Sequence, residues 1–302
     1  MVALPPDMDA REGANAWAER PQALAAAVRT APAVSASPSA ARDLLWALTA
    51  STLHRVRRGE GALLAINLSL IATRATDAAQ AVAAALVSLL VIAAMYAVND
   101  LWDAPADATN PKKDPALVAV YLERRALAVW SVLGLKTLTL LFAAATLGPA
   151  PSLAVAATML VNVVYSAALK GVPVLDVVWC GVWGAAYAAI TGASPTLLVV
   201  VGLMTAVCHL YQALDDRAAD AASAITTTAV RSRALSVLVL GVLVALLGVA
   251  LRPALGLPGA VSAATPLAVH LLVPSARIGW LATKAYFGVV WLCLLGLPDA
   301  FQ

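Results

Sequence analysis

Two short acidic stretches of similar spacing close apolar segments of this chain. The first, NDLWDAPAD, covers residues 99–107, and the second, YQALDDRAAD, covers residues 211–220. The two stretches can be superposed with one constant shift along the sequence, and this pairs Asn99 with Gln212, Asp103 with Asp216 and Asp107 with Asp220. Repeated acidic spacing is unusual at the ends of apolar segments and indicates a binding site.

Helical geometry places the polar side chains of each stretch on one face. At about 100° per residue, Asn99, Asp103 and Asp107 fall within roughly 80° of one another, and Asp100 lies at the edge of that arc. The matching positions of the second stretch follow the same rule. Each stretch therefore predicts a helix end that presents several oxygen atoms in one direction.

Crowded carboxylates repel each other and repel anions unless cations are bound between them. Oxygen ligands suit Mg²⁺, which keeps several waters and commonly bridges protein carboxylates to substrate phosphates. We therefore predict that the two faces oppose each other and grip a diphosphate through Mg²⁺. The predicted metal ligands are Asn99, Asp103, Asp107, Asp216 and Asp220. A solvated acidic helix end is the alternative reading of either stretch taken alone.

The composition is that of a membrane protein. Hydrophobic residues make up 62% of the chain and charged residues 12%, and the mean hydropathy is +0.84, against about 45–50% and 25% in soluble domains. Apolar stretches rich in Ala favour closely packed helices over the alternating strands of a barrel. The three cysteines show no paired spacing, and a net charge of +3 does not indicate nucleic-acid binding.

We expect an all-α, polytopic bundle of about nine transmembrane helices. Breaks rich in Pro and Gly separate these apolar segments, although two of the segments are short for a bilayer. The predicted spans are 61–74, 78–100, 123–147, 152–168, 176–191, 196–215, 233–251, 257–273 and 276–296.

Two domains are predicted. Residues 1–43, rich in Ala, Pro, Ser and Arg, form an N-terminal extension that is flexible or lies on the surface and does not resemble a secretory signal. Residues 44–302 form the transmembrane domain, which opens with an interfacial helix near 44–53.

Basic residues predict the orientation. Arg55, Lys112, Lys170, Arg217 and Arg277 fall in or beside loops on one side of the predicted bundle, and few basic residues fall on the other. By the positive-inside rule, the N-terminus and the loops beside the acidic stretches face the cytoplasm.

These motifs resemble those of the UbiA superfamily of intramembrane prenyltransferases. The two acidic stretches look like its paired aspartate-rich motifs, YSAALK (165–170) looks like its Tyr-Ser plus basic element, and ITTTAV (225–230) resembles its Thr-Thr stretch. The resemblance covers about residues 55–296. It implies a helical bundle around a central cavity that opens sideways to lipid.

The resemblance also implies a set of site residues. Mg²⁺ ions held by the two motifs would bind an isoprenyl diphosphate, and loop cations would neutralise its charge. The catalytic candidates carried over are Asn99, Asp100, Asp103, Asp107, Asp216 and Asp220. The substrate-binding candidates are Lys112, Lys113, Tyr165, Lys170, Gln212 and Arg217.

Two enzyme activities stay open at this point. A prenyltransferase ionises an isoprenyl diphosphate and passes the prenyl group to an aromatic, quinone-like or other lipophilic acceptor; a terpene cyclase of the same superfamily lets the cation react with its own double bonds. A transporter is the reading from another class, but such proteins place their polar site near the membrane midplane.

Further polar residues invite interpretation. Lys136 and Lys284 lie within predicted spans, where a lysine is a candidate for function, and His209 shares a helix with Asp216. Their roles stay open. Pro105 interrupts the first motif, so we expect a kink there that leaves Asp107 in loop geometry.

Overall fold

The computed structural model describes residues 38–75, 77–108, 110 and 113–297, and within them it contains helices and no strand. The elements are α2 (Pro38–Arg55), the π-helical turn η1 (Val56–Glu60), α3 (Ala62–Arg74), α4 (Ala78–Asp107), α5 (Pro115–Glu123), α6 (Arg125–Thr146), α7 (Pro149–Val164), the π-helical turn η2 (Tyr165–Leu169), α8 (Leu175–Ala189), α9 (Pro195–Ala222), α10 (Thr228–Arg231), α11 (Arg233–Ser262), α12 (Thr265–Leu272) and α13 (Ala276–Leu295).

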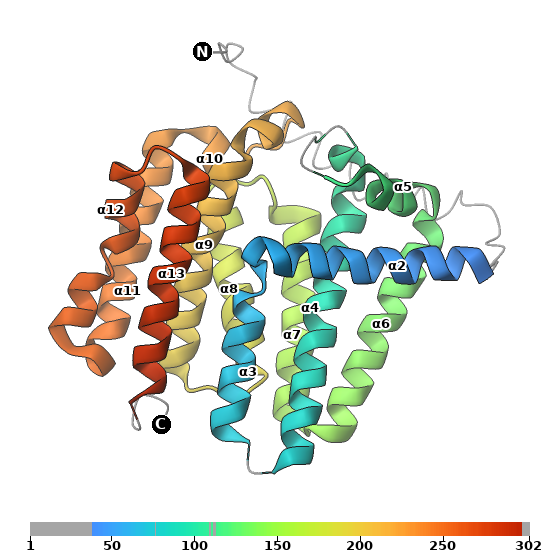
Figure 1. The fold of residues 1–302 in the computed structure, drawn as a ribbon, viewed down its shortest axis with the longest axis horizontal. Helices are drawn as coiled ribbons and strands as arrows, with labels where there is room; N and C mark the ends of the chain where they lie inside the picture. Colours follow the sequence, from blue (N-terminus) through green and yellow to red (C-terminus); the bar gives the residue numbers. More distant parts are fainter. Residues whose placement is uncertain (1–37, 76, 109, 111–112, 298–302) are drawn as a thin grey trace.

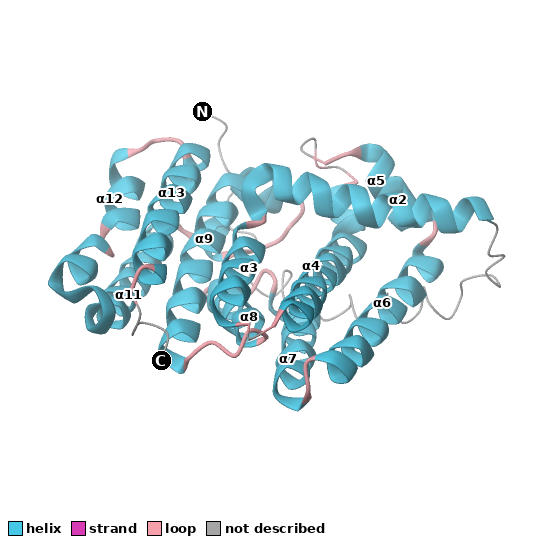
Figure 2. Ribbon diagram, turned by 60° about the horizontal axis from the view of Figure 1, so that its bottom comes forward, coloured by secondary structure: helices cyan, strands magenta, loops and turns pink. Residues whose placement is uncertain are grey.

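The main helices run side by side, and six of them surround a central cavity. These are α3, α4, α7, α8, α9 and α13, each of which contributes residues to the cavity wall. Helix α6 packs outside α4 and α7, while α11 and α12 pack beside α9 and α13 (Figures 1 and 2). Trp291 of α13 donates from its indole nitrogen to Ser69 of α3 at 2.8 Å, which links the first and last helices of the ring.

Small residues let neighbouring helices approach closely. A Cβ on Gly181 of α8 would lie 3.0 Å from the carbonyl oxygen of Gly202 on α9, and one on Gly184 would lie 2.2 Å from the Thr205 hydroxyl. Contacts this tight require glycine. They explain how van der Waals packing holds the bundle together where lipid removes the hydrophobic driving force.

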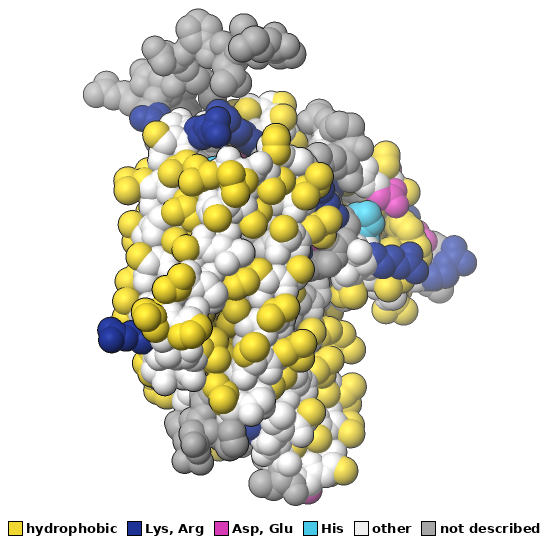
Figure 3. Space-filling view, turned by 60° about the vertical axis from the view of Figure 1, so that its left-hand side comes forward, with side chains coloured by type: hydrophobic (Ala, Val, Ile, Leu, Met, Phe, Trp, Pro, Cys, Tyr) yellow, Lys and Arg dark blue, Asp and Glu magenta, His cyan; other side chains and the backbone are white. Residues whose placement is uncertain are grey.

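The chain is an integral membrane protein. Six helical segments of the described part are long and apolar enough to cross a membrane, and α3 and α8 are shorter apolar helices. Figure 3 shows a broad hydrophobic face on which most of the visible Lys and Arg side chains lie toward the upper end and one protrudes lower down. Each of the nine predicted spans falls on helical segments, but the number of nine crossings stays a prediction.

The segment from Arg233 to Leu272 reverses direction. Gly256 adopts φ +64°, a left-handed conformation that favours glycine. A Cβ on Gly248, before the reversal, would lie 2.9 Å from the carbonyl oxygen of Ala260, after it. The two legs therefore pack against each other, as the separate predicted spans 233–251 and 257–273 require.

Helix α2 crosses one end of the bundle (Figure 1). With the short helix α5, which the sequence pattern did not predict, it packs on the last turns of α4 around Leu44, Val98 and Tyr121. The predicted interfacial helix thus begins at Pro38, inside the predicted N-terminal extension. Residues 1–37 lie outside the described residues.

Helix α4 continues past the predicted end of its span. It includes Pro105 and ends at Asp107, and the amide of Ala108 still donates to the carbonyl of Ala104 at 3.1 Å. The expectation of loop geometry at Asp107 was therefore wrong. The missing Pro105 amide removes a single rung near the helix end, where few bonds depend on it.

Candidate active site

Both acidic faces line one cavity of about 540 Å³. Helices α4 and α9 end on the same side of the bundle, where α5 and α10 follow them (Figure 1). Their matching residues stand on the cavity wall: Asn99, Asp103 and Asp107 from α4, and Gln212, Asp216 and Asp220 from α9. The structure thus brings together two stretches that lie more than a hundred residues apart.

Asn99 is held by two donors from the neighbouring segment. Its side-chain oxygen accepts a hydrogen bond from the Asn162 amide at 3.0 Å and from the Ser166 hydroxyl at 2.8 Å. These bonds fix the rotamer of Asn99 beside Asp103.

Lysines neutralise the other two oxygen-bearing residues of the α4 face. Lys170 donates to Asp103, and Lys113 pairs with Asp107 at 2.8 Å. Burial alone lowers the pKa of Lys170, but the carboxylates of Asp103, Asp220 and Asp107 outweigh burial and raise it. Lys170 therefore carries a full charge at neutral pH, between the two acidic faces.

The π-helical turn η2 positions several of these groups at once. Wider than an α-turn, it starts at Tyr165, whose carbonyl accepts the amide of Lys170 at 2.8 Å. Tyr165 consequently lines the cavity, Ser166 reaches Asn99, and Lys170 reaches Asp103. Such π-turns are frequent at functional sites.

A buried strap holds the loop that follows the second acidic stretch. Asp176, with no solvent exposure, accepts the Thr228 amide at 2.8 Å and also the Thr228 hydroxyl. The same hydroxyl oxygen accepts the Val174 amide at 2.7 Å. This strap fixes the turn in which Thr227 lines the cavity beyond Asp220.

The donor set fits Mg²⁺ bound together with a diphosphate. Among the described residues, no three acidic, histidine or cysteine side chains converge on one ion position. Mg²⁺ at phosphate sites takes only one or two carboxylates and completes its shell with phosphate oxygens and water. The two facing helices offer oxygen donors for such a Mg²⁺ ion. Lys113 and Lys170, which pair with the α4 carboxylates, add positive charge beside them.

Asp100 is turned away from the cavity. Its carboxylate accepts hydrogen bonds from Ser51 and Arg55 of α2. Arg55 also pairs with Glu60 at 3.1 Å and lies 4.9 Å over the Tyr96 ring, and these three residues line the cavity. Sequence reasoning missed Glu60, since nothing in the local pattern distinguishes it from a solvated residue.

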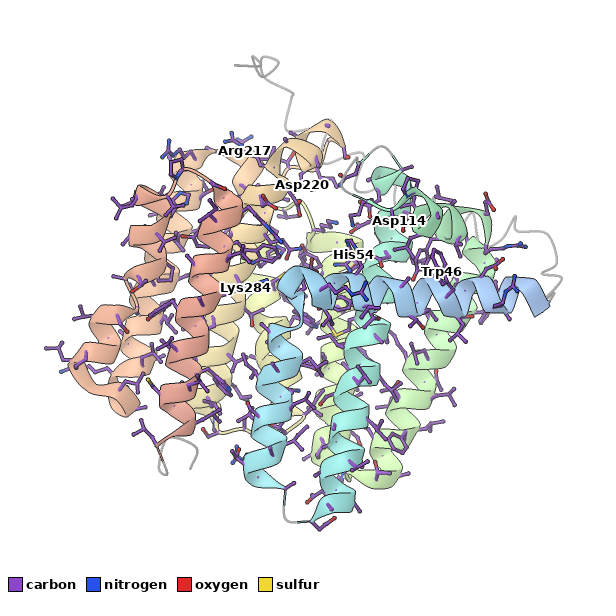
Figure 4. All side chains as sticks on the ribbon, in the orientation of Figure 1. Trp46, His54, Asp114, Arg217, Asp220 and Lys284 are labelled. Carbon is purple, nitrogen blue, oxygen red and sulfur yellow. The ribbon has the colours of Figure 1, made fainter. Side chains whose placement is uncertain are left out.

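The remaining predicted residues divide into two groups. Tyr165, His209 and Lys284 line the cavity, whereas Arg217 and Lys136 do not; Lys136 donates to the carbonyl of Met159 at 3.2 Å. Figure 4 shows Asp220 near the end of the bundle and Lys284 further down. Lys112 lies outside the described residues.

An aromatic stripe on α13 also lines the cavity. Trp280, Phe287 and Trp291 share one helix face, and the ammonium of Lys284, between them in sequence, lies 3.4 Å from the centre of the Trp280 ring. Spacings of seven and four residues were a usable signal. This spacing alone did not predict a cavity wall, because aromatic residues on an apolar helix more often pack in a core.

Exposed residues complete the wall between two helices. Ala62 and Ala65 of α3 and Gly288 and Leu292 of α13 line the cavity and are exposed. The cavity therefore opens between α3 and α13.

Comparisons with curated proteins find relatives over part of the chain. It is 35% identical over 144 residues to the lycopene elongase/hydratase of Halobacterium salinarum, which covers 45% of this chain and 51% of that protein. The corresponding protein of Haloferax volcanii is 37% identical over 144 residues, covering 45% and 47%. The chain therefore spans about half the length of the curated relatives it matches.

Solved structures share the fold over most of the chain. A UbiA homolog from Archaeoglobus fulgidus bound to DMAPP and Mg²⁺ has a TM-score of 0.55 at 19% identity, covering 78% of this chain and 97% of its own. A digeranylgeranylglyceryl phosphate synthase structure has a TM-score of 0.63 at 15% identity, covering 85% and 98%. The model of the UbiA prenyltransferase family matches residues 61–293, and the chain belongs to that family.

Proposed function

We propose that this protein is a Mg²⁺-dependent membrane enzyme that transfers a prenyl group from an isoprenyl diphosphate to a lipophilic acceptor and releases diphosphate. The observation that carries the proposal is the placement of two matched acidic faces, on α4 and α9, at the polar end of one cavity. The family match and the neighbours bound to DMAPP or GPP with Mg²⁺ support it.

The polar end supplies what a departing diphosphate needs. Mg²⁺ bound by the two faces would stabilise the negative charge that grows as the allylic C–O bond breaks. Lys113 and Lys170 pair with Asp107 and Asp103. They would supply further positive charge to the oxygens of the departing diphosphate. Asn99, held by Ser166 and Asn162, lines the cavity together with Asp103 and Asp107.

The apolar part of the cavity suits the allylic cation and its tail. Trp183, Phe287 and Trp291 line it, and aromatic faces stabilise a nearby cation by about 0.5–2 kcal/mol each. An apolar wall also excludes the water that would capture the cation.

The acceptor is proposed to be a neutral polyene. The curated relatives are named lycopene elongase/hydratases, so lycopene is the first acceptor to test. By the positive-inside rule, we propose that the polar end of the cavity faces the cytoplasm, where a diphosphate made in the cytosol would arrive.

Diphosphate release from purified protein in vesicles tests the proposal. With dimethylallyl or geranyl diphosphate, Mg²⁺ and lycopene, we expect diphosphate and a prenylated carotenoid. Asp103→Asn and Asp216→Asn should each lower release about 100-fold. Asp215→Asn is the matched control, because Asp215 is adjacent but does not line the cavity.

Two outcomes contradict this function. A cyclised product formed without an acceptor makes the protein a terpene cyclase. Absence of diphosphate release from either diphosphate, with every acceptor offered, rules out both enzyme readings.

A further inference from the structure

His209 and Tyr165 form a polar pair inside the cavity. The Tyr165 hydroxyl lies 3.2 Å from Nε2 of His209, and the two rings meet edge to face with centroids 5.7 Å apart. Both residues line the cavity. A hydrogen-bonded hydroxyl and imidazole on the cavity wall form a route for a proton.

The pair stands at the boundary between the polar and apolar parts of the cavity. On α9 the residues His209, Gln212, Asp216 and Asp220 are spaced by three, four and four, so they share one helix face. Asp216 and Asp220 mark the diphosphate end, and His209 lies about two turns deeper. Below it, Thr205 and Met204 continue the wall toward the prenyl tail.

The matching position on the opposite wall carries no base. The shift that pairs Asp103 with Asp216 pairs Tyr96 with His209, and the Tyr96 hydroxyl is used in a bond to the carbonyl of Glu60 at 2.9 Å. The imidazole is thus specific to the α9 wall, beside Tyr165.

Resting on the proposed function, we propose that His209, through the Tyr165 hydroxyl, takes the proton that ends prenyl transfer. The C–O bond to diphosphate breaks and its electron pair leaves with the diphosphate. A π pair of the acceptor forms the new C–C bond, and an adjacent C–H pair re-forms a double bond. The released proton goes to the Tyr165 oxygen, whose own hydroxyl proton moves to Nε2 of His209.

The chain supplies a matched control. His270 meets the ring of Tyr211 edge to face with centroids 6.0 Å apart, yet neither residue lines the cavity. His270→Gln changes the same residue type in a similar aromatic contact away from the cavity.

The test uses full-length protein in vesicles with geranyl diphosphate, Mg²⁺ and lycopene, and measures diphosphate release and products separately. In His209→Gln the ratio of olefin to water-captured alcohol should fall at least about tenfold while diphosphate release persists, and Tyr165→Phe should lower the same ratio. His270→Gln should keep the wild-type ratio.

Two results separate the possible failures. An unchanged olefin ratio in His209→Gln, with diphosphate released normally, overturns this inference and leaves the proposed function standing. Loss of diphosphate release in both variants, with Mg²⁺ dependence altered, would assign the pair to diphosphate binding and also overturn it. Absence of release in the wild-type protein removes the proposed function and this inference together.

Discussion

Arg55 and Asp100 form a buried ion pair that ties helix α2 to the first acidic stretch. Both side chains are about nine-tenths buried or slightly less, and Ser51 and Glu60 complete the cluster. Burial alone lowers the pKa of Arg55, but the Asp100 and Glu60 carboxylates outweigh burial and raise it. Arg55 thus stays charged. Asp100 binds Arg55 of α2, whereas Asn99 and Asp103 line the cavity.

Asp100→Asn should destabilise the protein through α2. Removing one partner of a buried pair costs about 3–5 kcal/mol, and the remaining Arg55–Glu60 pair places the expected loss at the lower end. Thermal unfolding in detergent measures it. The Mg²⁺ concentration for half-maximal diphosphate release should stay near the wild-type value, whereas Asp103→Asn should raise it. A raised Mg²⁺ requirement in Asp100→Asn would show that Asp100 acts at the metal.

Lys170→Gln should lower diphosphate release about 100-fold, as expected when an enzyme loses one preorganised group that stabilises the charge of the transition state. Lys170 contacts Asp103 and lines the cavity. Lys136→Gln is the control, because Lys136 contacts the carbonyl of Met159 and does not line the cavity. Equal loss of activity in the two variants would contradict the role given to Lys170.

Gly288→Leu should narrow the opening between α3 and α13. A Cβ at Gly288 would meet no atom within 4 Å, so a larger side chain starts in open space. We expect the variant to slow turnover of geranyl diphosphate more than turnover of dimethylallyl diphosphate. The measurement is the ratio of the two rates, compared with the wild-type ratio. Gly134→Leu on α6 is the control, because a Cβ there also meets open space and Gly134 does not line the cavity. If both variants keep the wild-type ratio, substrates reach the cavity by another path.

Asp176→Ala should destabilise the loop that follows Asp220. The substitution leaves the buried Thr228 amide and hydroxyl without their acceptor, which costs about 1–3 kcal/mol for each unsatisfied group. Thermal unfolding should show a lowered midpoint. Asp77→Asn, at the exposed N-cap of α4, should be nearly neutral because Asn caps as well as Asp. A midpoint unchanged by Asp176→Ala would mean that the strap contributes little.

The side of the membrane can be measured with single cysteines. After replacement of Cys180, Cys208 and Cys293, a cysteine at Asp114 should react with an impermeant thiol reagent from the cytoplasmic side. One at Arg252 should react from the opposite side, because the positive-inside rule predicts that the basic loops face the cytoplasm. Labelling of the two cysteines from the opposite sides would show that the protein has the reverse orientation in the membrane.

The amino-acid sequence by itself determined the class of structure. Long apolar segments must form helices in lipid, because only there are all backbone polar groups satisfied within the segment. Helical periodicity likewise determined that Asn99, Asp103 and Asp107 share a face, as do Gln212, Asp216 and Asp220. These are properties of residues close together in the chain.

Tertiary packing decided the rest. Asp100 lies one residue from Asn99 but about 100° around the helix, and the position of α2 directs it to Arg55. Lys170 meets Asp103, and Tyr165 meets His209, only because η2 packs against α4 and α8 with α9 within reach of its side chains. The α13 aromatic stripe became part of the cavity in the same way. Contacts between distant segments depend on how whole helices pack, and no local spacing encodes that arrangement.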